Sequence, residues 1–229
     1  IPVGRPFLDY VLAALADAGY REVCLVVGLH HDAVRERYGQ VCDPRLTVSF
    51  VTQSQPLGTA HALMAADNFV GTEEFLLINS DNYYPVTALA ALRCLPGPGL
   101  VGFDAGALSE RGNISPGRVN QYALLQRDAR DWLTGIIEKP EPNERPAGSG
   151  ELLVSMNCWR FGPSIWQACR SISKSARGEL ELPDAVAYSI NQLGQRYRVV
   201  VSHEPVLDLS YQRVVDFVAQ KLRGIEVNR

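Results

Sequence analysis

The chain has 229 residues, of which 46% are apolar and 21% are charged, and its formal net charge is −3. This composition is typical of a globular protein with a full core, and it excludes disordered, fibrous and repetitive chains. The weak negative charge gives no support for binding to nucleic acid or to an anionic membrane, and no apolar run is long enough to span a bilayer. The five cysteines are odd in number and lack a C-x-x-C pair, so they indicate reduced thiols in a cytoplasmic protein.

The first predicted elements are a helix and a strand. Residues 5–15 place apolar side chains at helical spacing, and Pro6 suits the first turn of a helix. Residues 22–27 are apolar on both faces, which predicts a strand covered by helices on both sides. This alternation predicts an α/β fold with right-handed crossovers and parallel pairing.

The loop after the next predicted strand, residues 46–51, is the most distinctive of the chain. Pro56 and Gly58 indicate a turn, and Thr59 suits the N-cap of a following helix. The amide of Gln53 can donate to and accept from the edge of a nucleobase, and a glycine lets a planar ring approach the backbone. Such a turn before a helix is common, so the loop alone leaves a purely structural role open.

A third apolar run, residues 75–78 after Glu74, ends abruptly in the polar sequence N-S-D-N. In open α/β sheets ligands bind outside the carboxyl ends of the strands, so this strand delivers Asp81 to the place where chemistry is usually done. A carboxylate there suits Mg²⁺, which takes oxygen ligands and is often shared with substrate phosphates. The alternative is a simple turn, which the residue types favour equally.

A charged pair, Glu138 and Lys139, follows the apolar residues 136–137, and Pro140 ends regular pairing. Lysine is a compact cation for a phosphate, and a neighbouring carboxylate can accept hydrogen bonds from sugar hydroxyls. An ordinary solvated charge pair at a strand end is the alternative. Residues 141–150 are rich in proline, glycine and charge, which indicates an exposed loop rather than a domain linker.

Five motifs together resemble one family, the sugar-1-phosphate nucleotidyltransferases. Residues 1–12 are similar to the family's L-P-V-x-x-x-P-L-L-E-Y-V-L, and residues 53–62 to its Q-x-x-P-L-G-T-A-H-A. Residues 79–82 resemble N-G-D-N, and residues 137–140 match x-E-K-P. Residues 155–158 stand where the family has N-x-G or N-A-G. Their common order over nearly the whole chain makes the resemblance specific.

The resemblance implies a Rossmann-like nucleotidyltransferase fold: a mostly parallel twisted sheet with helices on both faces and a small antiparallel insertion around the E-K-P motif. It implies transfer of a nucleotidyl group from a nucleoside triphosphate, with dTTP or UTP expected, to a sugar 1-phosphate. The products are a nucleotide sugar and pyrophosphate, and Mg²⁺ is the implied cofactor. Neither nucleic acid nor a membrane is an expected partner, and a homo-oligomer is left open.

The resemblance also implies roles for single residues. It assigns nucleotide binding to Gln53, Pro56, Gly58 and Thr59. Sugar-phosphate binding falls to Glu138, Lys139, Asn157 and Glu179. Asp81 and Lys139 are the expected catalytic residues, and Asp81 and Asp208 the expected metal ligands. Asp184 is a second acidic candidate beside Glu179, with the ordinary preference of helix starts for negative charge as the alternative.

Three departures from the family pattern bear on function. The glycine-rich loop that cradles the triphosphate is expected just before Ile1, so residues 1–229 are interpreted as a single nucleotidyltransferase domain lacking its first strand and this loop. Ala123 follows Tyr122 where the family commonly has glycine. The late W-x-D-x-G-T-P motif is reduced to V-L-D-L-S at residues 206–210, which keeps Asp208. A catalytically silent relative that binds a nucleotide or nucleotide sugar for regulation is therefore the alternative function.

Overall fold

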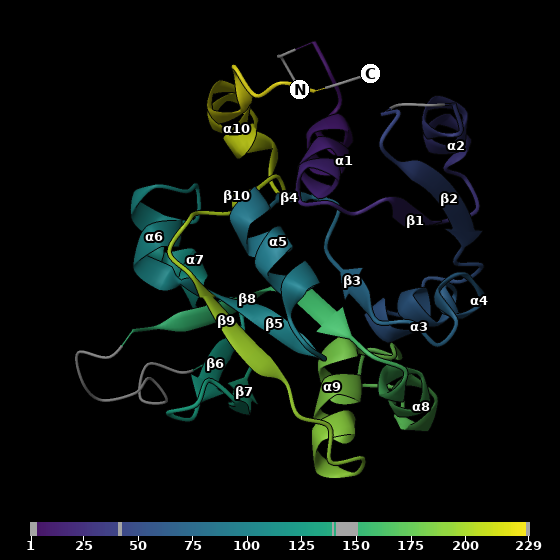
Figure 1. Ribbon diagram of the computed structural model, residues 1–229, viewed down its shortest axis with the longest axis vertical. Coiled ribbons are helices and arrows are strands. Elements are labelled where there is room, and N and C mark those ends of the chain that lie inside the picture. Colours follow the sequence, from purple (N-terminus) through teal and green to yellow (C-terminus); the bar gives the residue numbers. More distant parts are fainter. Residues whose placement is uncertain (1–3, 41–42, 139, 141–150, 228–229) are drawn as a thin grey trace. The chain divides into compact units, whose positions relative to one another are not determined.

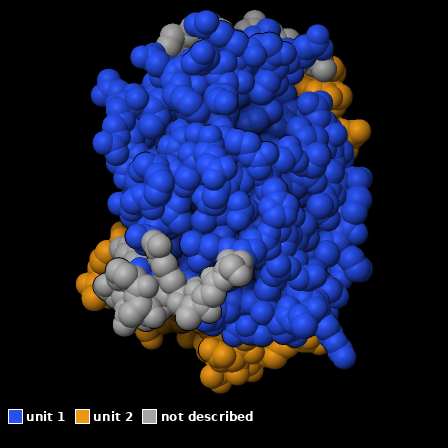
Figure 2. Space-filling view, turned by 90° about the vertical axis from the view of Figure 1, so that its left-hand side faces the viewer, with its two compact units in different colours: residues 1–19, 76–160, 197–228 blue, residues 20–75, 161–196, 229 orange. Residues whose placement is uncertain are grey.

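The computed structural model describes residues 4–40, 43–138, 140 and 151–227 (Figure 1). The chain divides into two compact units, coloured blue and orange in Figure 2. Unit 1 contains residues 1–19, 76–160 and 197–228, and unit 2 contains residues 20–75, 161–196 and 229. None of the helices in the described ranges is long and apolar enough to cross a membrane.

Unit 1 is built around a six-stranded sheet with the order β7-β6-β8-β5-β9, and β3 also pairs with β8. The strands of this sheet are β3 (Phe75–Leu77), β5 (Gly99–Asp104), β6 (Leu124–Arg127), β7 (Leu133–Ile137), β8 (Leu153–Phe161) and β9 (Arg198–Ser202), of which Phe75 and Phe161 are assigned to unit 2. Figure 1 shows β5 and β9 side by side, and they pair in parallel from Gly99↔Arg198 to Phe103↔Ser202. The strand β5 is buried over its first five residues, as the sequence pattern of a strand covered on both faces requires.

The α/β class and the antiparallel insertion are confirmed. The insertion is the hairpin of β6 and β7, which pair antiparallel from Leu124↔Ile137 to Arg127↔Leu133. Pairing in the described sheet is more mixed than the expected, mostly parallel arrangement, because the long strand β8 runs antiparallel to both β5 and β6.

The remaining elements of unit 1 surround this sheet. A short antiparallel pair joins β4 (Asn82–Tyr83) and β10 (Leu207–Asp208). Helix α1 (Phe7–Asp17) begins directly after Pro6, and its residues Phe7, Tyr10 and Val11 form one apolar cluster with Leu207 and with helix α10 (Val215–Leu222). The other helical segments are α5 (Val86–Cys94), α6 (Ala105–Glu110), α7 (Pro116–Val119) and the 3₁₀ turn η2 (Gln212–Val214).

Unit 2 combines a two-stranded parallel sheet with short helices. Strands β1 (Glu22–Val27) and β2 (Thr47–Thr52) pair in register from end to end. The helices are α2 (Asp32–Tyr38), α3 (Thr59–Met64), α4 (Asp67–Val70), α8 (Ser164–Ser171) and α9 (Leu182–Asn191). Trp166 of α8 stacks on the ring of Phe75 with centroids 5.1 Å apart, and its Nε1 donates to the carbonyl of Gly71 at 3.2 Å.

Candidate functional site

The Gln53 loop lies in unit 2, at the carboxyl ends of the two parallel strands. The backbone N–H of Gln53, the residue after β2, donates to the carbonyl of Val27, the last residue of β1, at 2.8 Å. The side-chain Nε2 of Gln53 donates to the carbonyl of Gly58 at 3.1 Å and lies 3.2 Å from Nδ1 of His61. Both ends of this residue are therefore fixed, and the orientation of its amide is set by the loop itself.

Gly58 occupies a position that another residue would disturb. Its φ of +101° belongs to the region that side chains disfavour, and an added Cβ would lie 2.5 Å from the carbonyl oxygen of Leu180. The Leu180 backbone also binds the loop on both sides of Gly58: its N–H donates to Leu57 at 2.7 Å, and its carbonyl accepts from Ala60 at 2.9 Å. Glu179 lies beside it, because the added Cβ would approach the Glu179 Cβ to 3.0 Å.

The N-cap expected at Thr59 differs from the structure. Helix α3 begins at Thr59 itself, with Gly58 as the capping residue and no side-chain cap. The Thr59 hydroxyl instead accepts the backbone N–H of Leu182, the first residue of α9, at 2.9 Å. That N–H is one of the unpaired donors at the start of a helix, so Thr59 stabilises a helix distant in sequence rather than its own.

The Asp81 turn, residues 79–82, lies in unit 1 and leads into the paired strands β4 and β10. Asp208 pairs with Asn82 in that ladder, and the N–H of Leu209 donates to the carbonyl of Asp81 at 2.8 Å. The carboxylate of Asp81 is exposed, and its Oδ2 accepts the Ser210 hydroxyl at 3.2 Å. The two aspartates predicted as metal ligands are thus carried by backbone segments bonded to each other.

Asp208 is buried and already has partners for both carboxylate oxygens. Oδ1 accepts the backbone N–H of Ser210 at 2.6 Å, and Oδ2 accepts Arg118 at 3.1 Å together with the hydroxyl of Tyr122. Burial alone would raise the pKa of this carboxyl, but the hydrogen bonds from Ser210 and Tyr122 and the charge of Arg118 outweigh burial and lower it. Burial, followed by the contact with Asp208, raises the pKa of Tyr122. The carboxylate of Asp208 is therefore charged and locally neutralised by a guanidinium.

The Arg118 side chain is held as firmly as its partner. It is 8% exposed, and its guanidinium carbon lies 4.3 Å from the centroid of the Tyr211 ring. Its Nε is buried without a hydrogen-bond partner among the described residues. A desolvated arginine against an aromatic face is a strong cation–π arrangement, which favours this one position of the guanidinium.

Asn157 lies on an irregular segment of β8. The pairing of β8 with β5 shifts register between Leu100 and Gly102, opposite this segment, and Asn157 has a φ of +55°. Such bulges and strained residues redirect a side chain out of the regular pattern and are enriched at functional sites. Glu138 is exposed directly after β7, and Lys139 lies outside the described residues.

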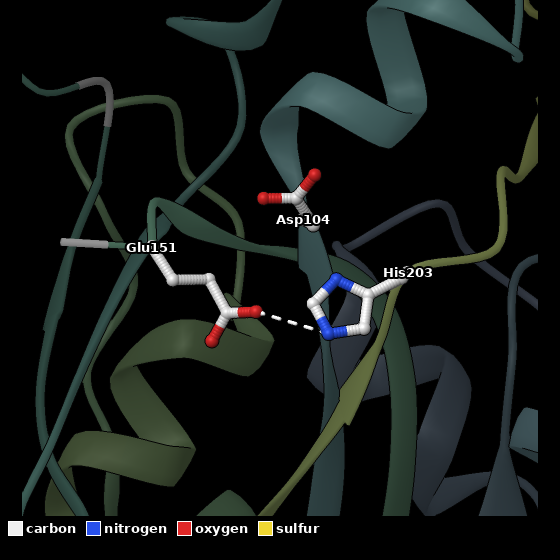
Figure 3. Close-up of side chains that lie close together, drawn as sticks. All are labelled: Asp104, Glu151 and His203. Atoms are coloured by element: carbon white, nitrogen blue, oxygen red, sulfur yellow. Dashed lines mark ion pairs between the residues drawn. The ribbon is translucent and has the colours of Figure 1, made fainter. Parts of the chain in front are cut away.

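A separate group of Asp104, Glu151 and His203 lies at the ends of β5, β8 and β9 (Figure 3). Their ligand atoms lie within 4.8 Å of one another, and Nε2 of His203 is 3.3 Å from Oε1 of Glu151. Glu151 also pairs with Arg127 at 2.8 Å, and Asp104 caps α6 by accepting the N–H of Ala107 at 2.7 Å. The two carboxylates are thus already engaged, and the group is a surface network of ion pairs and hydrogen bonds.

Comparison with known proteins decides the family. Residues 1–204 match the family model for nucleotidyl transferases. The chain belongs to this family. Glucose-1-phosphate thymidylyltransferases of Streptomyces griseus and Streptomyces antibioticus are 29% and 31% identical to it, over 83% and 82% of this chain but only 50% and 49% of their own lengths. The UTP--glucose-1-phosphate uridylyltransferase AglF of Haloferax volcanii is 25% identical over 96% of this chain and 85% of its own.

This nucleotidyl transferase spans about half the length of the two Streptomyces relatives. Its fold is shared with solved structures of UDP-glucose pyrophosphorylases. The enzyme from Acinetobacter baumanii matches with a TM-score of 0.72 over 98% of this chain and 85% of that chain, at 17% identity. A structure complexed with UDP-glucose matches with a TM-score of 0.65 over 91% and 80%, at 15% identity. At this level of identity the likeness supports the fold.

The predicted residues of this nucleotidyl transferase fall into two groups. Gln53, Gly58, Thr59 and Glu179 are tied together within unit 2, and Asp81 and Asp208 within unit 1. Pro56 is exposed on the Gln53 loop, and Asp184 is exposed in the first turn of α9. Sequence reasoning missed Arg118, which lies 90 positions from Asp208 and is part of no motif. The only local signal was the position of Tyr122, next to the replaced glycine.

Proposed function

We propose that the protein transfers a nucleotidyl group from a pyrimidine nucleoside triphosphate, dTTP or UTP, to a sugar 1-phosphate and releases pyrophosphate. The observation that carries this proposal is the Gln53 loop. Its amide is oriented by the loop backbone, beside a glycine that leaves no room for a side chain. Family membership and the thymidylyl and uridylyl activities named for the relatives support the same reading.

The Gln53 amide accounts for the choice of base. Its Nε2 is engaged by the loop, and Oε1 has no hydrogen-bond partner among the described side chains and backbone groups. An acceptor held in this way suits the imide N–H of uracil or thymine, which lies between two carbonyls. Adenine has no ring imide N–H and presents its donor on an exocyclic amino group, so it is a poorer match for an acceptor fixed in this position.

The exposed carboxylate of Asp81 fits a hard divalent cation, and we propose it as the residue that holds Mg²⁺. The ion, when bound, neutralises negative charge on the triphosphate. Asp208 fits the role less well, because joining a metal would require its carboxylate to release Arg118 or Tyr122. We therefore propose that the main role of Asp208 is to hold Arg118, and that metal binding by Asp208 is secondary.

We propose that the sugar 1-phosphate is bound by Glu138, Lys139, Asn157 and Glu179. Carboxylate and amide groups can accept and donate hydrogen bonds to sugar hydroxyls, and the lysine can bind the phosphate. Nucleotidyl transfer asks little covalent chemistry of the protein, since the attacking phosphate oxygen needs only to be aligned with the α-phosphorus. These residues would do that work by position and charge.

The described cysteines are all free, which supports the expected cytoplasmic location.

The test is pyrophosphate release by the protein at its full natural length, over a panel of nucleoside triphosphates and sugar 1-phosphates with Mg²⁺. We expect turnover with dTTP or UTP, and its loss in Asp81→Asn with the fold intact by circular dichroism. Near-normal turnover by Asp81→Asn would show that Asp81 is not the residue that holds Mg²⁺. Equal use of purine and pyrimidine triphosphates would count against the reading of Gln53.

A second candidate function is binding of a nucleotide or nucleotide sugar without turnover. The observation that favours it is the neutralised Asp208, because a carboxylate paired with Arg118 is not ready for a metal. Calorimetry with dTDP- or UDP-sugars separates the two. Tight binding without any pyrophosphate release over the whole substrate panel would support the silent relative.

A further inference from the structure

One buried hydroxyl, that of Tyr84, connects the Asp81 turn to the Asn157 bulge of β8. The Tyr84 side chain is 1% exposed and belongs to unit 1, as do both segments. Its Oη lies 2.6 Å from the carbonyl oxygen of Met156 and 3.4 Å from that of Asn157. The same oxygen accepts the backbone N–H of Asn79 at 3.3 Å and the side-chain Nδ2 of Asn82 at 3.2 Å.

These contacts use the full capacity of the group. A phenolic hydroxyl has one donor and two acceptor positions, and here it donates to the bulge while accepting from both sides of the Asp81 turn. Burial raises the pKa of Tyr84, so the hydroxyl keeps its proton and stays a donor. The oxygen is shielded from water. If the hydroxyl is removed, water therefore does not readily replace the hydrogen bonds that are lost.

The geometry needs such a tie. Asn157 holds a φ of +55° in the middle of a strand, a conformation that persists only when surrounding contacts determine it. The Asp81 turn precedes the strand β4, which begins at Asn82, and its backbone is tied to β10 through the bond from Leu209 to the carbonyl of Asp81. Asn82 also donates to the Met156 carbonyl at 3.5 Å, and its Oδ1 is buried without a partner in the described parts of the chain.

We propose that the Tyr84 hydroxyl is a positioning group that holds the Asp81 turn and the Asn157 bulge in one fixed arrangement. The inference rests on the proposed function, because it makes Tyr84 set the distance between the metal-side residue and a sugar-side residue. Because Tyr84 is 1% exposed, we assign it an effect through these two segments rather than through contact with a substrate. The Gln53 loop, which we propose holds the triphosphate base, belongs to unit 2, whereas Tyr84 and both of these segments belong to unit 1.

The variant Tyr84→Phe removes only the oxygen. We expect kcat to fall about tenfold or more, since small misplacements of reacting groups cost that much or more. The KM for the triphosphate should stay within about twofold, because the Gln53 loop is untouched. Tyr197→Phe is the matched control: Tyr197 is equally buried in unit 1 and packs edge-on against Trp159. That variant should keep its kcat within about twofold even if it is less stable.

Hydrogen exchange gives a readout that does not depend on turnover. In Tyr84→Phe, peptides covering residues 79–82 and 156–158 should both exchange faster, while in Tyr197→Phe both should stay as in the parent. A kcat within about twofold of the parent, or faster exchange in only one of the two segments, would overturn the coupling. Absence of transfer by the parent protein would refute the proposed function instead, and the exchange data would still decide whether Tyr84 ties the two segments.

Discussion

Among single residues, the proposed nucleotide site depends most on the backbone conformation of Gly58. Replacing it by alanine adds a Cβ at 2.5 Å from the Leu180 carbonyl in a backbone region that side chains disfavour. We expect Gly58→Ala to lower the free energy of unfolding by about 2 to 4 kcal/mol. It should also weaken triphosphate binding, because the Gly58 carbonyl orients Gln53. Urea unfolding and calorimetry measure the two effects.

Gly178→Ala is the control for this prediction. Gly178 lies in the same unit with a φ of +80°, but nothing lies within 4 Å of an added Cβ. It therefore carries the conformational cost without the collision, and its effect should be smaller by about 1 kcal/mol or more. Equal losses in the two variants would show that close packing against Leu180 is unimportant.

Gln53 is the residue that should decide the choice of base. Gln53→Ala removes the acceptor for the base N–H, which costs about 1 to 3 kcal/mol when the donor is left unpaired. The KM for dTTP or UTP should rise roughly tenfold to a hundredfold, and discrimination against purine triphosphates should shrink. Gln55→Ala changes an exposed glutamine of the same loop and should leave both parameters unaltered. Unchanged discrimination in Gln53→Ala would place base recognition elsewhere.

Residues at strand ends could be found from the sequence, and their distant partners could not. Gln53 is the residue after β2, and Asp81 lies four residues after the end of β3, so each is placed by a strand that is close to it in the chain. The contact between Arg118 and Asp208 depends on how α7 and β10 meet, which no local pattern records. Thr59 shows the same limit, since its hydroxyl serves α9 rather than its own helix.

At the scale of elements, the pair of Arg118 on α7 and Asp208 on β10 is a buried ion pair. Removing one charge leaves the other buried and unpaired, so Asp208→Asn should lower the free energy of unfolding by about 3 kcal/mol. Arg118→Met should cost a similar amount, and the double variant less than the sum of the two. Additive losses in denaturant unfolding would show that the two side chains do not interact.

The stability that Asp208 contributes should depend on pH in a defined direction. Its pKa is lowered in the folded protein, so the contribution is fully present above the unfolded value of about 3.9. It is lost as the pH falls through the lower, folded value. The difference in unfolding free energy between the parent and Asp208→Asn should be constant from about pH 5 to 8 and shrink below about pH 4. A difference that grows on acidification would contradict this sign.

The order of the elements could be predicted better than their pairing. The alternation of helices and strands follows from periodicity, whereas the hairpin at the E-K-P motif is expected from the family resemblance. The antiparallel course of β8 does not, because an apolar run that is buried on both faces reads the same in either direction. The irregular φ of Asn157 is likewise a product of tertiary packing rather than of its neighbours in sequence.

At the scale of the whole molecule, the two units differ in how their sheets are built. Unit 1 has the six-stranded sheet, whereas the described sheet of unit 2 has two strands, an arrangement that is marginal without other support. Each unit contains a buried thiol, Cys158 in unit 1 and Cys169 in unit 2. Burial raises the pKa of both thiols, that of Cys169 to about 12. Both are therefore unreactive in the native state.

Alkylation at increasing urea concentration should separate the two thiols. We expect Cys94, which is exposed, to react without urea, then Cys169, and Cys158 last. The order follows from the smaller sheet of unit 2, and peptide mass spectrometry reads each cysteine separately. Coincident midpoints for Cys169 and Cys158 would show that the two units unfold as one.

The reactivity of each buried thiol thus reports the unfolding of the unit that contains it. A ligand that binds one unit should protect the thiol of that unit more than the thiol of the other, because binding stabilises only the folded form that it contacts. Mass shifts at Cys169 and Cys158 after alkylation would then show which unit binds an unknown nucleotide or sugar phosphate, before any turnover is detected and without a labelled ligand.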